Sequence, residues 1–134
     1  MATSKVTYQG DLRTSSVHLQ SGNTIITDAP TDNHGKGEAF SPTDSVANAL
    51  ATCMFTVMGI KARDLEVDFS GSTAEVTKIM GTDPRRIIEI QVTFQMNVTA
   101  DDKTRTILEK TAMTCPVLFS LHPDIKKEVV FNWK

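Results

Sequence analysis

The sequence predicts an α+β fold in which antiparallel sheets pack on one long central buried helix. Two stretches carry this prediction. Residues 41–60 are apolar in most directions of a helical wheel, and residues 88–98 alternate strictly between apolar and polar side chains. A helix that is apolar nearly all round belongs inside a core, and an alternating strand has one face on a core and one in water. The order of strands, helix, two strands, helix and strand indicates an α+β rather than a doubly wound arrangement.

Length and charge narrow the class of protein. A chain of 134 residues is most simply one domain, residues 1–134, with one core. The formal net charge of −2 gives no electrostatic reason to expect nucleic acid or an anionic membrane as a partner. We find no signal peptide and no apolar run of transmembrane length, so we expect a cytoplasmic protein without a membrane partner. Two cysteines in a reducing compartment rarely form a permanent bridge.

The first forty residues predict a small meander. Short strands are expected at residues 5–9, 16–20 and 24–27, with turns around Gly10 and Gly22. Residues 28–40 are rich in turn formers and charges without a period, which predicts a loop leading into the helix. Loops of that length often line a functional site.

The helix start is well marked. Ser41 suits the N-cap, Pro42 the first helical position, and Asp44 the acidic position of a capping box. The helix is expected to end near residue 60, before the polar segment 61–64. Cys53 lies in the middle of this helix, eleven residues after Pro42.

The second half predicts two long strands, a helix and a last strand. We expect a strand at 65–69 that bulges near Gly71 and resumes to residue 78, then a hairpin loop at 81–85 and the alternating strand 88–98. Asp101 is expected to cap a second helix, which Pro116 interrupts. If residues 116–121 form a short helix, Cys115 lies at its N-terminus, where the dipole favours a thiolate. Val129, Phe131 and Trp133 share one face of the last strand.

One sheet and one further helix cannot cover a helix that is apolar on all sides. The remaining apolar surface therefore predicts a homodimer that packs these helices together.

The two cysteines allow two interpretations from the residues alone. They are either small buried hydrophobes that never meet, or reactive thiols. Three scattered histidines without metal-ligand spacing argue against a zinc protein, and we expect no metal or other cofactor.

Several segments resemble the osmotically inducible protein C and organic hydroperoxide resistance family (OsmC/Ohr). They are Ser41-Pro42-Thr43-Asp44 through Ala51-Thr52-Cys53-Met54, Thr114-Cys115-Pro116-Val117, Ser120-Leu121-His122-Pro123-Asp124 and the hairpin 80–87. The resemblance implies an intertwined homodimer with sites built from both subunits, and thiol-based reduction of organic hydroperoxides. It also implies a thiol reductant, either a protein-bound dithiol of the dihydrolipoamide type or a small thiol.

The resemblance assigns roles to three residues. Cys53 would attack the peroxide and become a sulfenic acid, and Cys115 would then form a disulfide with it. Only about 3% of an ordinary cysteine is ionised at neutral pH and burial lowers this further, so Cys53 needs a cation beside it. The resemblance points to Arg13 as that cation, and the alternative is a solvated arginine in a turn.

One position departs from the family pattern. The family usually has a glutamate ten residues before the helix cysteine, which orients the arginine, and here that residue is Thr43. Asp44 lies about 180° from Cys53, on the far side of the helix. Asp44 could still hold the arginine at the start of the helix, or Glu38 in the loop could hold it. The alternative for Asp44 is that it only caps the helix.

Further candidates surround this set. His122 could donate a proton, and an apolar pocket for the peroxide could be lined by Met54, Phe55, Met58 and Phe119, which could equally be core. The alternative function is a non-catalytic dimer of the same fold that binds an apolar ligand, with both cysteines as core residues.

Overall fold

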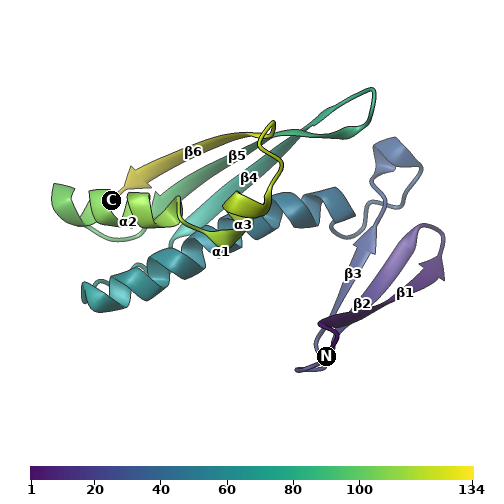
Figure 1. The fold of residues 1–134 in the computed structure, drawn as a ribbon, viewed down its shortest axis with the longest axis horizontal. Helices are drawn as coiled ribbons and strands as arrows, with labels where there is room; N and C mark the ends of the chain where they lie inside the picture. The colour runs from purple at the N-terminus through teal and green to yellow at the C-terminus, as the bar shows by residue number, and fades with distance from the viewer. The chain divides into compact units, whose positions relative to one another are not determined.

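The computed structural model describes residues 1–134, which divide into two compact units, residues 1–46 and 47–134 (Figure 1). The whole buried hydrophobic cluster lies in the second unit. The first unit contributes no buried residue to this cluster, and the expectation of one domain for the whole chain stays a prediction.

The first unit is the predicted meander. Its elements are β1 (Ser4–Gly10), β2 (Arg13–His18), β3 (Thr24–Asp28) and a short 3₁₀ turn η1 (Thr31–Asn33). The strands are antiparallel in the order β1-β2-β3. The second strand begins and ends earlier than we predicted, because the chain turns tightly at Asp11 and Leu12, which both have positive φ (53° and 62°). Positive φ at both central residues is the geometry of a type I′ hairpin turn.

Helix α1 (Pro42–Asp64) begins as predicted but runs one turn further. Ser41 and Asp44 form the capping box: the Asp44 N–H donates to Ser41 Oγ and the Ser41 N–H to Asp44 Oδ2, both at 3.0 Å. Six residues at helical spacing are buried: Ala47, Leu50, Ala51, Met54, Met58 and Ala62. Ala62 continues this stripe, which explains why the helix includes the polar segment 61–64.

The predicted strand 65–69 is wrong, because that segment terminates the helix. The Glu66 N–H donates to the Arg63 carbonyl and the Val67 N–H to the Ala62 carbonyl, with Glu66 at φ 54°. These two bonds and the left-handed residue make a Schellman motif. Leu65, Val67 and Phe69 still pack against the core, so their alternating pattern reports burial without a strand.

The second sheet has the order β4-β5-β6. Its strands are β4 (Thr73–Gly81), β5 (Arg86–Met96) and β6 (Lys126–Trp133). β4 and β5 form the predicted antiparallel hairpin, whereas β6 runs parallel to β5. On β5 the alternation holds: Ile90, Val92, Phe94 and Met96 are buried, and the residues between them are more exposed.

Two short helices lie between β5 and β6. In α2 (Asp102–Ala112) the Asp101 carboxylate accepts the Thr104 N–H at 2.8 Å, as the predicted cap should. The chain then turns at residues 113–115 and forms α3 (Pro116–Ser120). Helices α1 and α2 cover the same face of the sheet (Figure 1) and contribute with β5 to one hydrophobic core. The predicted α+β architecture of sheets on a long helix is confirmed.

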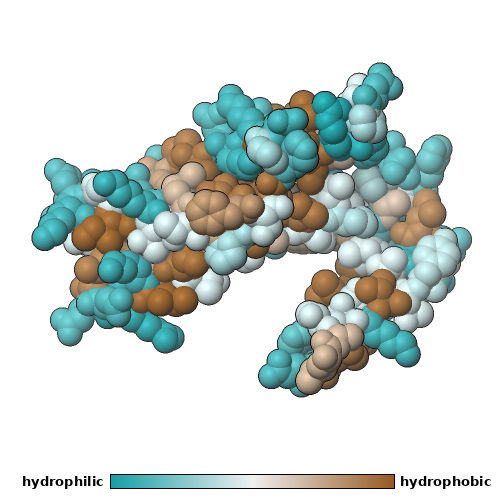
Figure 2. Space-filling model, in the orientation of Figure 1, coloured by the Kyte–Doolittle hydropathy of each residue, from teal (hydrophilic) through white to brown (hydrophobic).

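Only one stripe of α1 is covered within the chain. Val46 and Ile60 remain 42% and 62% exposed, and Figure 2 shows hydrophobic residues gathered on the surface over this helix. By length and composition α1 could also span a membrane, with a mean hydropathy of 1.3, contrary to our expectation that no such run exists. The core helix of a soluble protein passes the same test, and the buried stripe of α1 packs as such a helix does.

Candidate active site

The two cysteines of the chain meet in the second unit. Cys53 lies on α1 and is half-buried, whereas Cys115 is fully buried at the N-cap of α3, and both are free thiols. The two side chains lie close enough to interact, and Cys53 contributes to raising the pKa of the Cys115 thiol. Residues that are far apart in the sequence are thus brought into one contact by the packing of α1 and α3.

Burial determines the protonation of Cys115. Desolvation raises the pKa of this thiol, the hydrogen bond from the Leu118 N–H lowers it, and the hydrogen bond and charge of Cys53 raise it again. The Leu118 N–H lies 3.2 Å from Cys115 Sγ, so the cysteine does cap α3. Our expectation that the helix terminus would favour a thiolate there is wrong in its net effect, because the cost of burying a charge exceeds the contribution of one short helix.

Arg13 lies in the first unit and is held by an acid that we did not predict. Its Nε donates to Asp28 Oδ1 at 2.7 Å and its Nη2 to Asp28 Oδ2 at 2.8 Å, a bidentate pair. Arg13 and Asp28 are direct partners in the β2–β3 register. Asp28 is 1% exposed, and the Arg13 hydrogen bonds hold its pKa below the ordinary range. Only the strand register could have revealed this pair from the sequence.

The acids that we had considered for this role are placed differently. Glu38 Oε1 lies 3.6 Å from Arg13 Nη2, but its side chain is 63% exposed. Asp44 closes the capping box of α1, and the Thr43 hydroxyl hydrogen-bonds to that of Ser41 at 3.2 Å. Arg13 and Cys53 belong to different units, so their contact stays a prediction.

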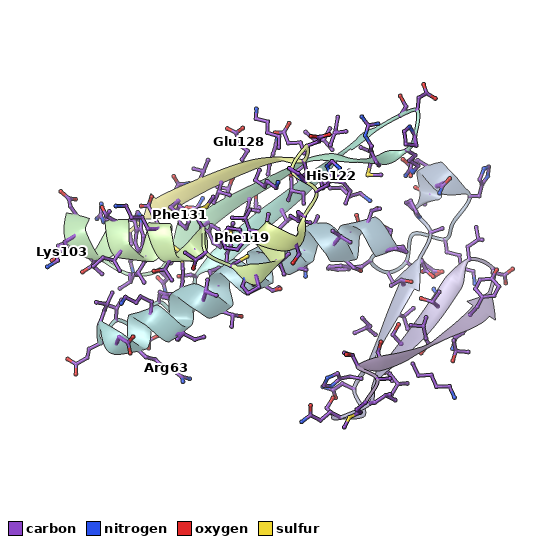
Figure 3. All side chains as sticks on the ribbon, in the orientation of Figure 1. Arg63, Lys103, Phe119, His122, Glu128 and Phe131 are labelled. Carbon is purple, nitrogen blue, oxygen red and sulfur yellow. The ribbon has the colours of Figure 1, made fainter.

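The predicted pocket residues separate into three groups. Met54 and Met58 are fully buried in the core, which agrees with the expectation that these residues are core, and they line none of the described pockets. Phe55 stacks on Phe69 with ring centroids 6.1 Å apart, and both line a pocket of about 410 Å³ that contains neither cysteine. Phe119 is 74% exposed on α3 and lines no described pocket (Figure 3).

His122 follows α3 in an exposed turn (Figure 3). Its Nδ1 accepts the Asp124 N–H at 3.0 Å, which gives the ring a role in shaping that turn. No group of three or more His, Cys, Asp or Glu side chains could hold a metal ion.

Comparison with known proteins supports this fold and family. The family model described as OsmC-like protein matches residues 35–130. The chain belongs to the OsmC-like family. A solved structure from Psychrobacter arcticus 273-4, described as a candidate osmotic stress induced and detoxification response protein, is 62% identical, with a TM-score of 0.96 over 98% of this chain and 96% of that one. The resemblance stated from the sequence is thus confirmed.

More distant OsmC-like structures share the fold alone. An organic hydroperoxide resistance protein OsmC from Legionella pneumophila has a TM-score of 0.72 at 12% identity, covering 98% of both chains. An organic hydroperoxide resistance protein from Elizabethkingia anophelis has a TM-score of 0.75 at 12% identity, covering 100% of this chain and 98% of that one. Among curated proteins none matches.

Proposed function

We propose that this OsmC-like chain is a thiol-dependent peroxidase that reduces organic hydroperoxides through Cys53 and Cys115. The observation that carries the proposal is the proximity of a half-buried thiol, Cys53, to a fully buried one, Cys115, whose pKa it raises. Two cysteines that serve only as small hydrophobes have no need to meet. A pair in contact, in contrast, can pass from sulfenic acid to disulfide without a large movement of the chain.

The first step oxidises Cys53. Its thiolate attacks one oxygen of the peroxide, so that an S–O bond forms and the O–O bond breaks. The alkoxide leaves, takes up a proton and departs as an alcohol. Cys53 becomes a sulfenic acid, and the hydroperoxide is reduced by two electrons.

The second step consumes Cys115. Its sulfur attacks the sulfenic sulfur of Cys53, a disulfide forms, and the hydroxyl leaves with the Cys115 proton as water. A dithiol of the dihydrolipoamide type, or a small thiol, then restores both cysteines by exchange. We propose the cytosol as the compartment, because this regeneration requires a reducing thiol pool.

Arg13 is the proposed cation beside Cys53. A guanidinium at contact distance would stabilise the thiolate by its positive charge and would bind the departing peroxide oxygen. The support for this assignment is the resemblance together with the bidentate pair that fixes the Arg13 side chain.

We propose a homodimer as the working form. Apolar side chains are exposed on both units: Val6, Tyr8 and Ile25 are 61%, 65% and 64% exposed on the small sheet, and Ile60 is 62% exposed on α1. A three-stranded sheet with so much apolar surface needs a partner. Analytical ultracentrifugation should give twice the chain mass, and an Ile60→Glu variant should shift the equilibrium toward monomer. A parent that sediments as a monomer would remove the dimer.

The peroxidase is tested by counting thiols. The reduced protein receives one equivalent of cumene hydroperoxide, after which free thiols are titrated in denaturant and a tryptic map is recorded. We expect the loss of two thiols and a Cys53–Cys115 linked peptide. Cys53→Ser should keep its remaining thiol, whereas Cys115→Ser should lose its thiol to sulfenic acid. If the parent keeps both thiols, the function is not a peroxidase.

The second candidate function is binding of an apolar ligand without catalysis. It is favoured by the pocket of about 410 Å³ that Phe55, Phe69 and Val67 help to line and that contains no cysteine. The same peroxide experiment separates the two functions. A ligand-binding protein would take up an apolar fluorescent probe in competition with fatty acid and leave both thiols unreacted.

A further inference from the structure

The carboxylate of Asp28 accepts three hydrogen bonds. Oδ1 accepts Arg13 Nε at 2.7 Å, and Oδ2 accepts both Arg13 Nη2 at 2.8 Å and the Glu38 N–H at 3.2 Å. The Asp28 N–H donates to the Phe40 carbonyl at 3.1 Å. Because the Asp28 side chain is almost fully buried and held by these hydrogen bonds, it is restricted to one conformation. The Asp28 carboxylate in turn fixes the Arg13 side chain.

The loop that follows Asp28 is folded back onto the same point. The Gly37 N–H donates to the Ala29 carbonyl and the Ala29 N–H to the Leu12 carbonyl, both at 3.1 Å. A Cβ at Gly35 would clash with the Ala29 carbonyl oxygen, so this loop accepts no larger residue there. The turn before Arg13 is also constrained, because Leu12 is held at φ 62°, which is unfavourable for a residue with a bulky side chain.

The bidentate pair leaves one edge of the guanidinium for other partners. Asp28 occupies Nε and Nη2, and Glu38 lies near Nη2, whereas no hydrogen bond within the chain involves Nη1. The two N–H groups of Nη1 can therefore donate to a sulfur or oxygen anion. This is the arrangement expected of a cation that is oriented by one acid and acts on another group.

We propose that Asp28 is the positioning residue for Arg13, in the role that the family usually gives to a helix glutamate and that Thr43 cannot perform here. The inference rests on the proposed peroxidase function. Asp28 acts from the end of β3, through the β2–β3 register, and fixes the Arg13 side chain so that its Nη1 edge is left for another partner.

Whether Asp28→Asn speeds or slows the oxidation of Cys53 distinguishes positioning of Arg13 from a simple charge effect. Asp28→Asn removes a negative charge beside Arg13, so a pure charge effect would favour the Cys53 thiolate and speed its oxidation at neutral pH. Loss of positioning would slow the reaction in spite of the added positive potential. Asp28→Glu keeps the charge but lengthens the side chain by one methylene, so a charge effect predicts the parent rate and positioning predicts a slower one.

The experiment measures the rate constant of Cys53 oxidation by cumene hydroperoxide from pH 5 to 9, with circular dichroism to show that each variant is folded. We expect Asp28→Asn to be roughly 10–100-fold slower than the parent, since a displacement of about 1 Å costs up to about that factor. Arg13→Lys lacks the bidentate fork. When Asp28→Asn is combined with Arg13→Lys, the rate constant should fall by less than about threefold relative to Arg13→Lys alone. The matched control is Asp101→Asn, which removes a cap carboxylate elsewhere in the chain and should leave the rate unchanged.

Each outcome decides the proposal. An Asp28→Asn rate equal to or above that of the parent, or full additivity with Arg13→Lys, overturns the role of Asp28 while the peroxidase stands. If Asp28→Asn does not fold, Asp28→Glu decides: a slowed rate supports positioning, and the parent rate overturns it. A parent protein that keeps both thiols after peroxide overturns the peroxidase and this inference together.

Discussion

Oxidation should stabilise the chain through a Cys53–Cys115 disulfide. The two cysteines are 62 positions apart in the sequence, and in the chain-entropy model closing such a loop stabilises the folded state by about 4 kcal/mol when the bond fits without strain. With an unfolding entropy of roughly 2 cal/mol/K per residue, or about 0.3 kcal/mol/K for 134 residues, this gain corresponds to about 14 °C in Tm. The value is an upper limit, because any strain in the bond lowers it.

The assay is differential scanning calorimetry of the reduced and the peroxide-oxidised protein at one concentration. Cys115→Ser, treated in the same way, is the control and should show no comparable rise, because its sulfenic acid has no thiol partner. A disulfide-linked protein with a Tm equal to or below that of the reduced form would refute the reasoning. That result would mean that the two sulfurs can bond only by distorting the packing of α1 against α3.

Three further predictions follow from named contacts. In the proposed mechanism Arg13 donates to the reacting oxygen, so Arg13→Ala should slow oxidation of Cys53 by roughly 10²–10³-fold, measured by stopped-flow with cumene hydroperoxide; a parent-like rate would remove Arg13 from the site. Ser41→Ala should lower the free energy of unfolding by about 1 kcal/mol in urea titration, because the capping box of α1 loses its hydroxyl; an unchanged value would mean that the cap adds nothing. Because the folded state raises the pKa of Cys115, the unfolded chain ionises first, so the stability of the reduced protein should fall as pH rises above about 8.5. Cys115→Ser should lose this alkaline dependence, and a parent whose Tm falls no more steeply than that of the variant contradicts it.

Local signals in the sequence were enough for most of the elements. The capping box at Ser41, the cap at Asp101 and the alternation along β5 each depend on residues within a few positions of one another. Such patterns have a direct physical reading, and the structure agrees with all three. The resemblance to the family supplied the larger arrangement and is confirmed by the match to residues 35–130.

The predictions that failed had one of two causes. Either the interaction joins residues far apart in the sequence, or a helix ends without the glycine that usually marks its end. Residues 65–69 alternate like a strand, but a Schellman motif without glycine holds Glu66 in a left-handed conformation. The parallel pairing of β5 with β6 depends on the path of α2 and α3 between them. Asp28 was missed because only the β2–β3 register places it opposite Arg13.

The environments of the two thiols fix the order in which they should react. Cys115 is fully buried and its pKa is raised by desolvation, so at neutral pH it stays protonated and is a poor first nucleophile for a peroxide. Cys53 is half-buried and reaches the surface of α1, where a peroxide can approach it. In the proposed mechanism Cys53 becomes a sulfenic acid, and the neighbouring Cys115 then attacks it and delivers its proton to the leaving hydroxyl. A reversed order would require a buried neutral thiol to react before an accessible one, and alkylation with one equivalent of iodoacetamide should therefore label Cys53 ahead of Cys115.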